Sequence, residues 1–504
     1  MKGAAPLQVV FASSEAMPWS HTGGLAEVAA ALPAALHGSL IGGRPAEVTV
    51  ALPLYRATRT WAEANGRALD DTGVHLEFHM AGQRLTMDLL QWREDGGPRW
   101  VFVDCPQLFD RDGLYDPPGQ GAYADNPLRF GAFCRAVLWG VPHLLDGPPA
   151  ILHAHDWQTA LLPLWLATER QEPWAQCRSV FTIHNLAFQG VLDKAWLPRL
   201  GLPWQLFHSD GVEFWDRLNL LKGGIVFADA LTTVSPTYAS EILGPAAGEH
   251  LDGLLRSHAG KLEGILNGID SQAWSPETDH HIAATYSAAD PSGKADCRAA
   301  LLAEVGLEAN AQQPVFGVVA RFAWQKGLDL VAECVPSLIH HDARLVILGS
   351  GDPGLERRFS ALAHHHRAHV AVRLGFDVGL AHRIEAGADA FLMPSRYEPC
   401  GLNQMFSMAY GTLPVVHNVG GLRDTVVPAT SATLADGSAT GFVFEHPDAI
   451  GLRWAMETAI SMFRDRPSQW RQLMENGMRR DWSWAASAQR YANLYERVLG
   501  SATS

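Results

Sequence analysis

The stretch LQVVFASSEAMPWSHTGGLAEVAAALP (residues 7–33) contains an apolar, β-branched run, a pair of glycines and an alanine-rich run, in that order. The first run is typical of a strand buried on both faces, and the last is typical of a helix. Gly23 and Gly24 lie between them. A glycine turn at this point lets the backbone approach a ligand closely and directs free N–H groups outward. The stretch therefore predicts the first strand and helix of a parallel α/β sheet.

The same alternation of short apolar runs and helical patterns continues along the chain. Similar strand-like runs occupy residues 46–53, 99–106, 150–156, 177–185, 228–236, 314–322, 343–352, 369–376, 388–395, 412–418 and 441–446. Such alternation indicates a mostly parallel α/β sheet. Because the rhythm pauses around residues 245–276, we expect two α/β domains that meet near residue 260. Open sheets bind ligands at the carboxyl ends of their strands, so two of them favour a ligand held between the domains.

Composition narrows the class of protein. The chain has 504 residues, 47% of them hydrophobic and 18% charged, which is ordinary for a globular protein of two domains. Its formal net charge of −14 argues against binding to nucleic acid or to an anionic membrane. Six scattered cysteines without CxxC pairs, together with a weak N-terminal apolar run, favour the cytoplasm over secretion. No stretch has membrane-spanning length.

The Gly23–Gly24 turn has two interpretations. Its free amides suit a phosphate group, and His21 stands just ahead of them. Alternatively, it is a tight turn with no ligand. A nicotinamide cofactor is disfavoured, because no GxGxxG motif follows the strand.

Two cations lie in a later strand-to-helix loop, in ARFAWQKGLDLVAECVPSLI (residues 320–339). Arg321 ends a predicted strand, and Lys326 precedes a predicted helix. A diphosphate at this sheet edge would meet two positive side chains and a helix terminus. The alternative is a pair of solvated surface cations.

A third such loop opens PSRYEPCGLNQMFSMAYGTLPVV (residues 394–416). Glu398 in this loop is placed to accept hydrogen bonds from sugar hydroxyls or to stabilise positive charge on a sugar ring; the alternative is a surface carboxylate. Cys400 is a better packing residue than nucleophile, since the sequence places no histidine next to it.

Two histidine groups need weighing. HAHDW (residues 153–157) ends a buried-type strand, where side chains more often face a ligand than the core. The HHH run at 364–366 lies in a polar region and is interpreted as a solvated surface. Neither group has the spacing of a zinc site, so no metal is expected.

Taken together, these stretches resemble the bacterial glycogen synthase and plant starch synthase family of glucosyltransferases. The resemblance rests on SSEAMPW with HTGGLAEV, HAHDWQTALLP, FTIHNLAFQG, TVSPTYASEI, ILNGID with WSP, ARFAWQKGLDL, LGSGDPGLE, and PSRYEPCGLNQMFSMAYGTLPVV with GGLRDTV, in the family's order. It implies a GT-B fold, in which two Rossmann-like doubly wound domains face each other across a deep cleft. It also implies retaining transfer of glucose from a nucleotide sugar, usually ADP-glucose, to an α-1,4-glucan, with no other cofactor.

The resemblance also assigns domains and site residues. Residues 1–260 would form the acceptor-side domain, completed by a C-terminal helix in 481–504, and residues 261–480 the donor-binding domain. The implied catalytic residues are Arg321 and Lys326 on the donor diphosphate, and Glu398, His155 and Asp125 near the glucose. The implied donor-binding residues are His21, Gly23, Gly24, Gly349, Gly351, Cys400, Gly401, Leu402 and Thr425.

One position departs from the family pattern. The first motif usually reads Lys-Thr-Gly-Gly-Leu, and His21 takes the place of the lysine. Histidine is mostly neutral at pH 7, whereas lysine is a permanent cation. Two alternatives therefore stay open: a related retaining enzyme that uses UDP-glucose or a small acceptor such as maltose phosphate, and a glucan-binding homologue without activity. Retention of Arg321, Lys326 and Glu398 argues against the second.

Overall fold

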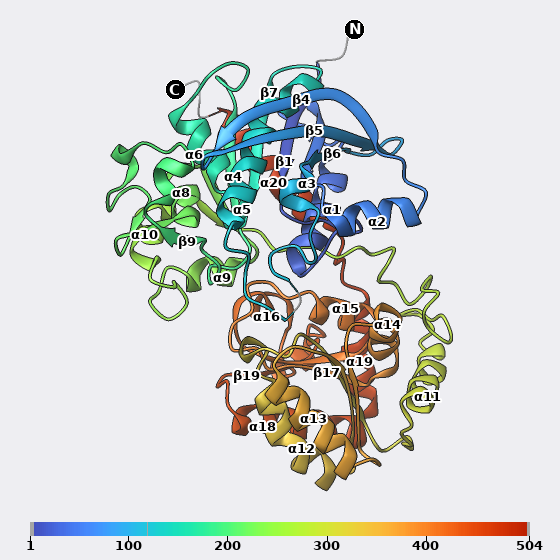
Figure 1. The fold of residues 1–504 in the computed structure, drawn as a ribbon. Helices are drawn as coiled ribbons and strands as arrows, with labels where there is room; N and C mark the ends of the chain where they lie inside the picture. The colour runs from blue at the N-terminus through green and yellow to red at the C-terminus, as the bar shows by residue number, and fades with distance from the viewer. Residues whose placement is uncertain (1–4, 118, 501–504) are drawn as a thin grey trace. The chain divides into compact units, whose positions relative to one another are not determined.

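The computed structural model describes residues 5–117 and 119–500, and the chain divides into two compact α/β units (Figure 1). The first unit contains the residues up to Val234, Ala239–Asn267 and the segment from Trp484. The second contains Ser235–Tyr238 and Gly268–Ser483. The boundary lies beyond residue 260 because β13 (Leu262–Gly264) pairs in parallel with β12 (Ala230–Thr233), which keeps this segment in the first sheet.

The first sheet is parallel over most of its width. Its strand order is β13-β12-β8-β7-β1-β3-β6-β5-β4, where β1 is Leu7–Ala12, β3 Arg44–Pro53, β6 Arg99–Asp104, β7 Pro149–His155 and β8 Arg178–Ile183. The pairs from β13 to β6 are all parallel. β1 is buried along its whole length, as its continuous apolar sequence predicts.

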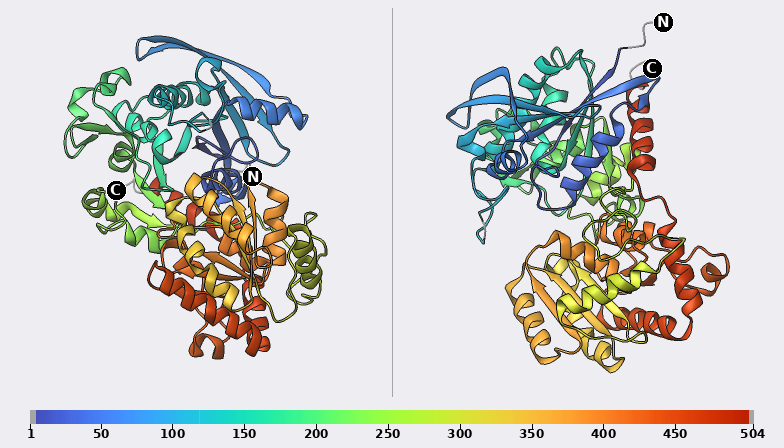
Figure 2. Two further views of the ribbon diagram at one scale, coloured as in Figure 1. Left: turned by 60° about the horizontal axis from the view of Figure 1, so that its bottom comes forward. Right: turned by 90° about the vertical axis from the view of Figure 1, so that its right-hand side faces the viewer.

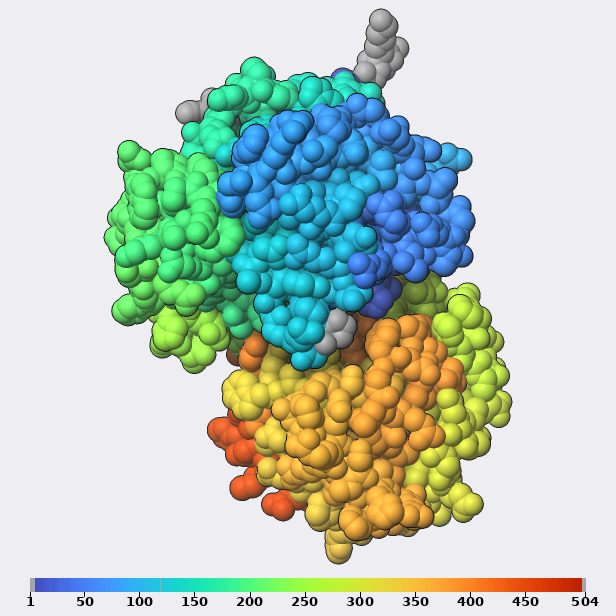
Figure 3. All heavy atoms as spheres, viewed as in Figure 1, coloured from blue at the N-terminus to red at the C-terminus, as the bar shows by residue number. Residues whose placement is uncertain are grey.

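An antiparallel hairpin extends one edge of this sheet and was not predicted. It consists of β4 (Asp70–Met80) and β5 (Gln83–Arg93), joined at Ala81 and Gly82, which have φ angles of 52° and 77°. Figure 3 shows the blue segment that contains both strands on the outer face of the first unit. The hairpin alternates exposed and covered residues, so it lacks the apolar runs from which the other strands were predicted.

The second sheet is entirely parallel. Its order is β16-β15-β14-β17-β18-β19, with β16 at Val370–Leu374, β15 Arg344–Gly349, β14 Val315–Val319, β17 Ala390–Met393, β18 Leu413–His417 and β19 Phe442–Phe444. Helices α12 (Leu328–His340), α13 (Pro353–His365), α14 (Val378–Gly387) and α18 (Ala449–Asp465) alternate with the strands. All six strands coincide with runs that the sequence predicted. The prediction of α/β architecture with parallel sheets is confirmed.

The last helix belongs to the first unit. Two views show α20 (Trp484–Gly500, red) beside α1 (Gly24–Leu36, blue) (Figure 2). Tyr491 and Tyr495 on α20 are fully buried, and the Tyr495 hydroxyl lies 2.7 Å from Nδ1 of His153 on β7. The far end of the chain thus supplies part of the first core. No described helix combines the length and apolar character that crossing a lipid bilayer demands.

Removing the Tyr495 side chain tests how much α20 contributes to the stability of the first unit. We expect Tyr495→Ala to destabilise the first unit by about 3–5 kcal/mol, because it leaves a cavity under the sheet. Hydrogen exchange measured by mass spectrometry should show faster exchange in β7 and α20 and unchanged exchange in β14–β19. The exposed Trp454→Ala on α18 is the control and should change neither. Equal acceleration in both units for Tyr495→Ala would contradict the assignment of α20.

Candidate functional site

The loop that carries the glycine pair is fixed by a buried carboxylate. Glu15 is 3% exposed, and its Oε2 accepts hydrogen bonds from the Thr22 amide and from the Thr22 hydroxyl, the latter at 2.9 Å. Gly23 is the N-cap of α1, and no side chain caps this helix end. A Cβ atom on Gly23 or Gly24 would meet nothing within 4 Å. Packing inside the unit therefore gives no reason for glycine here, whereas close approach of an outside group does. His21, like the glycines, is exposed.

His155 lies at the end of β7 and is fully buried. Its Nδ1 is 2.9 Å from Nε2 of His184, while its own Nε2 has no hydrogen-bond partner among the described residues. Burial, with smaller contributions from the neighbouring histidines, holds the pKa of His155 well below its ordinary value, so the ring is neutral at pH 7. A neutral imidazole with one free nitrogen can hydrogen-bond a hydroxyl group.

His153 has a structural environment instead. Its Nδ1 meets the Tyr495 hydroxyl, and its Nε2 lies 2.6 Å from the hydroxyl of Thr182. Both ring nitrogens are therefore satisfied by the protein. Of the two histidines in the HAHDW motif, only His155 keeps a ring nitrogen without a hydrogen-bond partner among the described residues.

Asp125 is the N-cap of α4 (Asn126–Gly140) and is bound by an arginine of its own unit. Both of its carboxylate oxygens lie 2.7 Å from the Arg111 guanidinium. Partial burial acts to raise the pKa of Asp125, but the ion pair outweighs it and lowers the pKa overall. Asp125 is thus a half-exposed anion whose charge is shared with Arg111.

In the second unit, Lys326 and Glu398 form a close pair. The Lys326 Nζ lies 2.6 Å from Glu398 Oε2, and the Ser395 hydroxyl donates to the same oxygen at 2.9 Å. The Glu398 side chain is 7% exposed and that of Lys326 is 22% exposed. The negative charge of the Glu398 carboxylate is therefore balanced by Lys326. The Lys326 ammonium keeps two further N–H donors for another partner.

A second ion pair holds together the two loops that carry Lys326 and Glu398. The Arg396 guanidinium binds both oxygens of Asp329 at 2.8 and 2.6 Å, and the Arg396 amide donates to the Gln325 carbonyl. Arg321, at the start of the first of these loops, is exposed. Within residues 5–117 and 119–500 its guanidinium has no protein anion bound to it, so its charge is available to a ligand.

Gly349 is the last residue of β15, Gly351 follows it, and both lie against residues 320–322. A Cβ on Gly349 would come within 1.9 Å of the Ala320 carbonyl oxygen, and one on Gly351 within 2.5 Å of the Phe322 carbonyl oxygen. The Gly351 amide donates to Glu356 at 2.8 Å. These glycines thus let two strand-end loops touch through their backbones.

The loop after Glu398 packs against a neighbouring short helix, α16 (Gly420–Thr425). Cys400 is buried, and Gly401 and Leu402 are half-buried. The buried Gln404 donates to the carbonyls of Cys400 and Gly401 and to the Thr425 hydroxyl, which in turn donates to the Gly421 carbonyl at 2.6 Å. Thr425 is 1% exposed, so its hydroxyl braces the loop from behind.

The residues that sequence reasoning missed are those that hold others in place: Glu15, Arg111, His184, Ser395, Arg396 and Gln404. Glu15, Ser395, Arg396 and Gln404 share a quoted stretch with a predicted site residue, but nothing in their spacing indicates their partners. Their roles follow from side-chain contacts that the fold creates.

Asp156, directly after His155, is expected to make the stability of the protein depend on pH. Burial raises its pKa to about 7, against backbone hydrogen bonds from His184 and Asn185 that lower it. In the unfolded chain the carboxyl loses its proton near pH 4, at about its ordinary pKa. The folded protein therefore binds the extra proton between these values, and its stability falls as the pH rises through this window. Asp156→Asn cannot titrate, so its stability relative to the parent should rise by up to about 1.4 kcal/mol per pH unit there.

Urea unfolding followed by tryptophan fluorescence at pH 5, 6, 7 and 8 measures this difference. The exposed Asp70→Asn on β4 is the control and should give a flat difference. A flat profile for Asp156→Asn as well would contradict a raised pKa.

Comparison with known proteins identifies the family of the chain. The starch synthase catalytic domain family matches residues 8–257, and the glycosyl transferases group 1 family matches residues 304–474. The glycogen synthase of Anaeromyxobacter dehalogenans (strain 2CP-C) is 48% identical over 497 residues, which are 98% of this chain and 100% of that protein. The glycogen synthase of Myxococcus xanthus (strain DK1622) is 46% identical over 496 residues, again 98% and 100% of the two chains.

A solved structure is also similar over the full length. The catalytic domain of starch synthase IV from Arabidopsis thaliana, bound to ADP and acarbose, matches with a TM-score of 0.87 and 32% identity, covering 98% of this chain and 100% of that one. The chain therefore belongs to the family of bacterial glycogen synthases and plant starch synthases, and it is a glycosyltransferase with the GT-B fold.

Proposed function

We propose that the protein transfers glucose from ADP-glucose to the non-reducing end of an α-1,4-glucan, with retention of the anomeric configuration. The observation that carries the proposal is the Lys326–Glu398 pair at 2.6 Å, together with the exposed Arg321 in the same loop as Lys326. The ADP and acarbose bound to the plant relative support a nucleotide donor and a glucan-like acceptor.

The second unit supplies the charges that this reaction needs. When the glycosidic bond to the diphosphate breaks, negative charge grows on the leaving oxygen, and positive charge grows on the sugar ring. Arg321 and the free N–H donors of Lys326 face the first charge, and Glu398 is suited to the second. Each preorganised donor of this kind is worth roughly 3–4 kcal/mol of transition-state stabilisation.

Glu398 fits an orienting role better than a nucleophilic one. Its Oε2 already accepts hydrogen bonds from Lys326 and Ser395, which withdraw electron density from the carboxylate. We therefore assign it to the donor hydroxyls and to the developing charge. The departing phosphate itself then takes the proton of the acceptor hydroxyl, on the same face of the sugar.

The first unit supplies uncharged and backbone groups. The free Nε2 of neutral His155 is assigned to a glucosyl hydroxyl, and the uncapped amides at Gly23 and Gly24 to a phosphate. The exposed His21 belongs to the same loop. The six buried cysteines, none of them in a disulfide, fit an enzyme that works in the reducing cytoplasm.

Removing the Lys326 ammonium tests the leaving-group assignment. We expect Lys326→Ala to lower kcat by about 10²–10³-fold, as loss of one preorganised donor does, with glucan affinity nearly unchanged. Initial rates with ADP-glucose and glycogen, together with glycogen binding measured by affinity electrophoresis, give the two quantities. Lys194→Ala, which removes an exposed lysine paired with Asp216, is the control. Unchanged turnover with weakened glucan binding would remove the role.

Histidine at position 21, where the family usually has lysine, affects which sugar donor we expect the protein to use. We expect ADP-glucose to be used in preference to UDP-glucose with glycogen as acceptor, and His21→Lys to raise kcat because it adds a permanent cation to the glycine loop. A panel of both donors, each with glycogen and with short maltodextrins, measures this. Faster turnover with UDP-glucose, or with the short acceptors, would favour the alternative that His21 motivates.

A further inference from the structure

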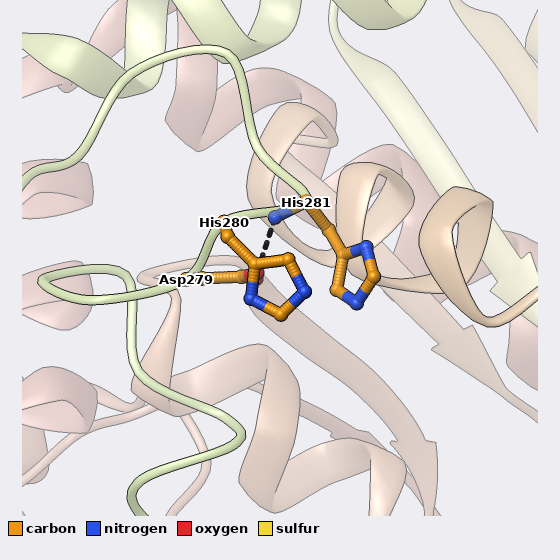
Figure 4. Close-up of side chains that lie close together, drawn as sticks. All are labelled: Asp279, His280 and His281. Carbon is orange, nitrogen blue, oxygen red and sulfur yellow. Dashed lines mark hydrogen bonds between the residues drawn. The ribbon is translucent and has the colours of Figure 1, made fainter. Parts of the chain in front are cut away.

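A group of potential metal ligands lies in the segment between β13 and α11 (Gly293–Val305), where the sequence predicted none. Asp279, His280 and His281 each offer one ligand atom, and these three atoms lie within 4.8 Å of one another. Figure 4 shows both imidazole rings on the same side of the chain, with the Asp279 carboxylate beside them. Asp279 is buried, His281 is half-buried and His280 is exposed, so the group opens to solvent on one side.

A local turn brings these consecutive side chains together. The Asp279 Oδ1 accepts a hydrogen bond from the His281 amide at 2.7 Å, which bends the backbone after Asp279 (Figure 4). In an extended chain, neighbouring side chains point to opposite faces. Here the two ring centroids are only 4.0 Å apart, with the planes inclined by 39°.

The carboxylate is held rigidly by two groups from the helices beneath it. The Tyr410 hydroxyl donates to Asp279 Oδ2 at 2.6 Å, and His382 Nδ1 lies 2.8 Å from the same oxygen. The Asp279 side chain is 1% exposed, with Oδ2 bound by these two groups and Oδ1 by the His281 amide. Among the described residues no second donor binds Oδ1, so this oxygen keeps a lone pair for another partner.

A third imidazole lies close by. The His382 ring centroid is 4.8 Å from that of His281, and the ring stacks on Trp274 at 3.8 Å. Metal-binding carboxylates and histidines are commonly oriented by hydrogen bonds of this kind from surrounding side chains. His382 and Tyr410 already supply them to Asp279.

We propose that Asp279, His280 and His281 form a binding site for a divalent cation of the zinc class. Two imidazole nitrogens and one carboxylate oxygen are a donor set that Zn²⁺ prefers, whereas Mg²⁺ and Ca²⁺ prefer oxygen donors alone. Tetrahedral ligation brings ligand atoms to about 3.3 Å from one another at Zn–ligand distances of about 2.0–2.2 Å. The rings of His280 and His281 reach this spacing by rotating their side chains, and solvent supplies the remaining position.

The ion would stabilise the packing of this segment against α14 and α15 of the same unit. Asp279 is bound to His382 on α14 and to Tyr410 at the end of α15 (Asn403–Ala409), and Trp274 stacks on Phe406 of α15 at 3.8 Å. Because α15 directly follows the loop of Glu398, the cation would also stabilise the helix that supports this loop. This role is separate from glucose transfer, and it does not depend on the proposed donor or acceptor.

Zinc titration of the untagged, full-length protein after removal of metals tests the site. The measurements are isothermal titration calorimetry with zinc buffered by nitrilotriacetate, the melting temperature with and without zinc, and the absorption spectrum of the Co²⁺ form. We expect one tight zinc ion per chain, a raised melting temperature and a cobalt d–d band. His280→Asn/His281→Asn removes two of the three protein ligands, so it should lose tight zinc binding, the melting-temperature shift and the cobalt band.

His364→Asn/His365→Asn is the matched control, since it removes two adjacent, exposed histidines whose rings lie 5.4 Å apart. It should keep the affinity of the parent. Far-UV circular dichroism and the metal-free melting temperature verify that both variants fold. The proposal is overturned if the parent shows no saturable zinc binding at micromolar concentration, or if His280→Asn/His281→Asn binds zinc as the parent does.

Discussion

The site of the second unit depends on backbone-to-backbone contact around residues 394–400. Gly327, at a φ angle of 64°, lies so close to this segment that a Cβ would be 2.1 Å from the Pro394 carbonyl oxygen. Gly420, at 46°, would similarly place one 1.9 Å from the carbonyl oxygen of Glu398. Any larger residue at either position would push the loops apart. The distance between Lys326 and Glu398 is therefore set by steric exclusion, and the Arg396–Asp329 ion pair then secures it.

The candidate site residues of the two units differ in burial and charge. Around His155 the first unit is buried, its histidines are neutral, and burial raises the pKa of Asp156 to about 7. Such groups hydrogen-bond hydroxyls without bringing an unpaired charge into a low dielectric. In the second unit, the cationic side chains of Arg321 and Lys326 are accessible at least in part, which suits a diphosphate.

Buried residues that hold the loops in place matter to the site as much as the groups that face a ligand. Glu15 fixes the glycine loop through Thr22, and Gln404 ties the Cys400–Gly401 turn to Thr425. The plant starch synthase keeps the same fold at 32% identity. Much of the chain can therefore change, because a fold of this kind depends on buried apolar periodicity and on a small number of close contacts at strand ends.

The sequence by itself determined the parallel strands, the strand-end positions of Arg321, Lys326, Glu398 and His155, and the family, because continuous apolar runs and short ordered motifs are local in the chain. It did not reveal the β4–β5 hairpin, whose alternating, largely exposed residues lack such a run. Only the tertiary structure decided that His153 is satisfied by Tyr495, that Arg111 binds Asp125, and that Asp279 is held by His382 and Tyr410. These outcomes depend on burial and on contacts between residues far apart in sequence. Hydrogen bonding and charge are fixed only when the chain has folded, which is why no pattern of neighbouring residues encodes them.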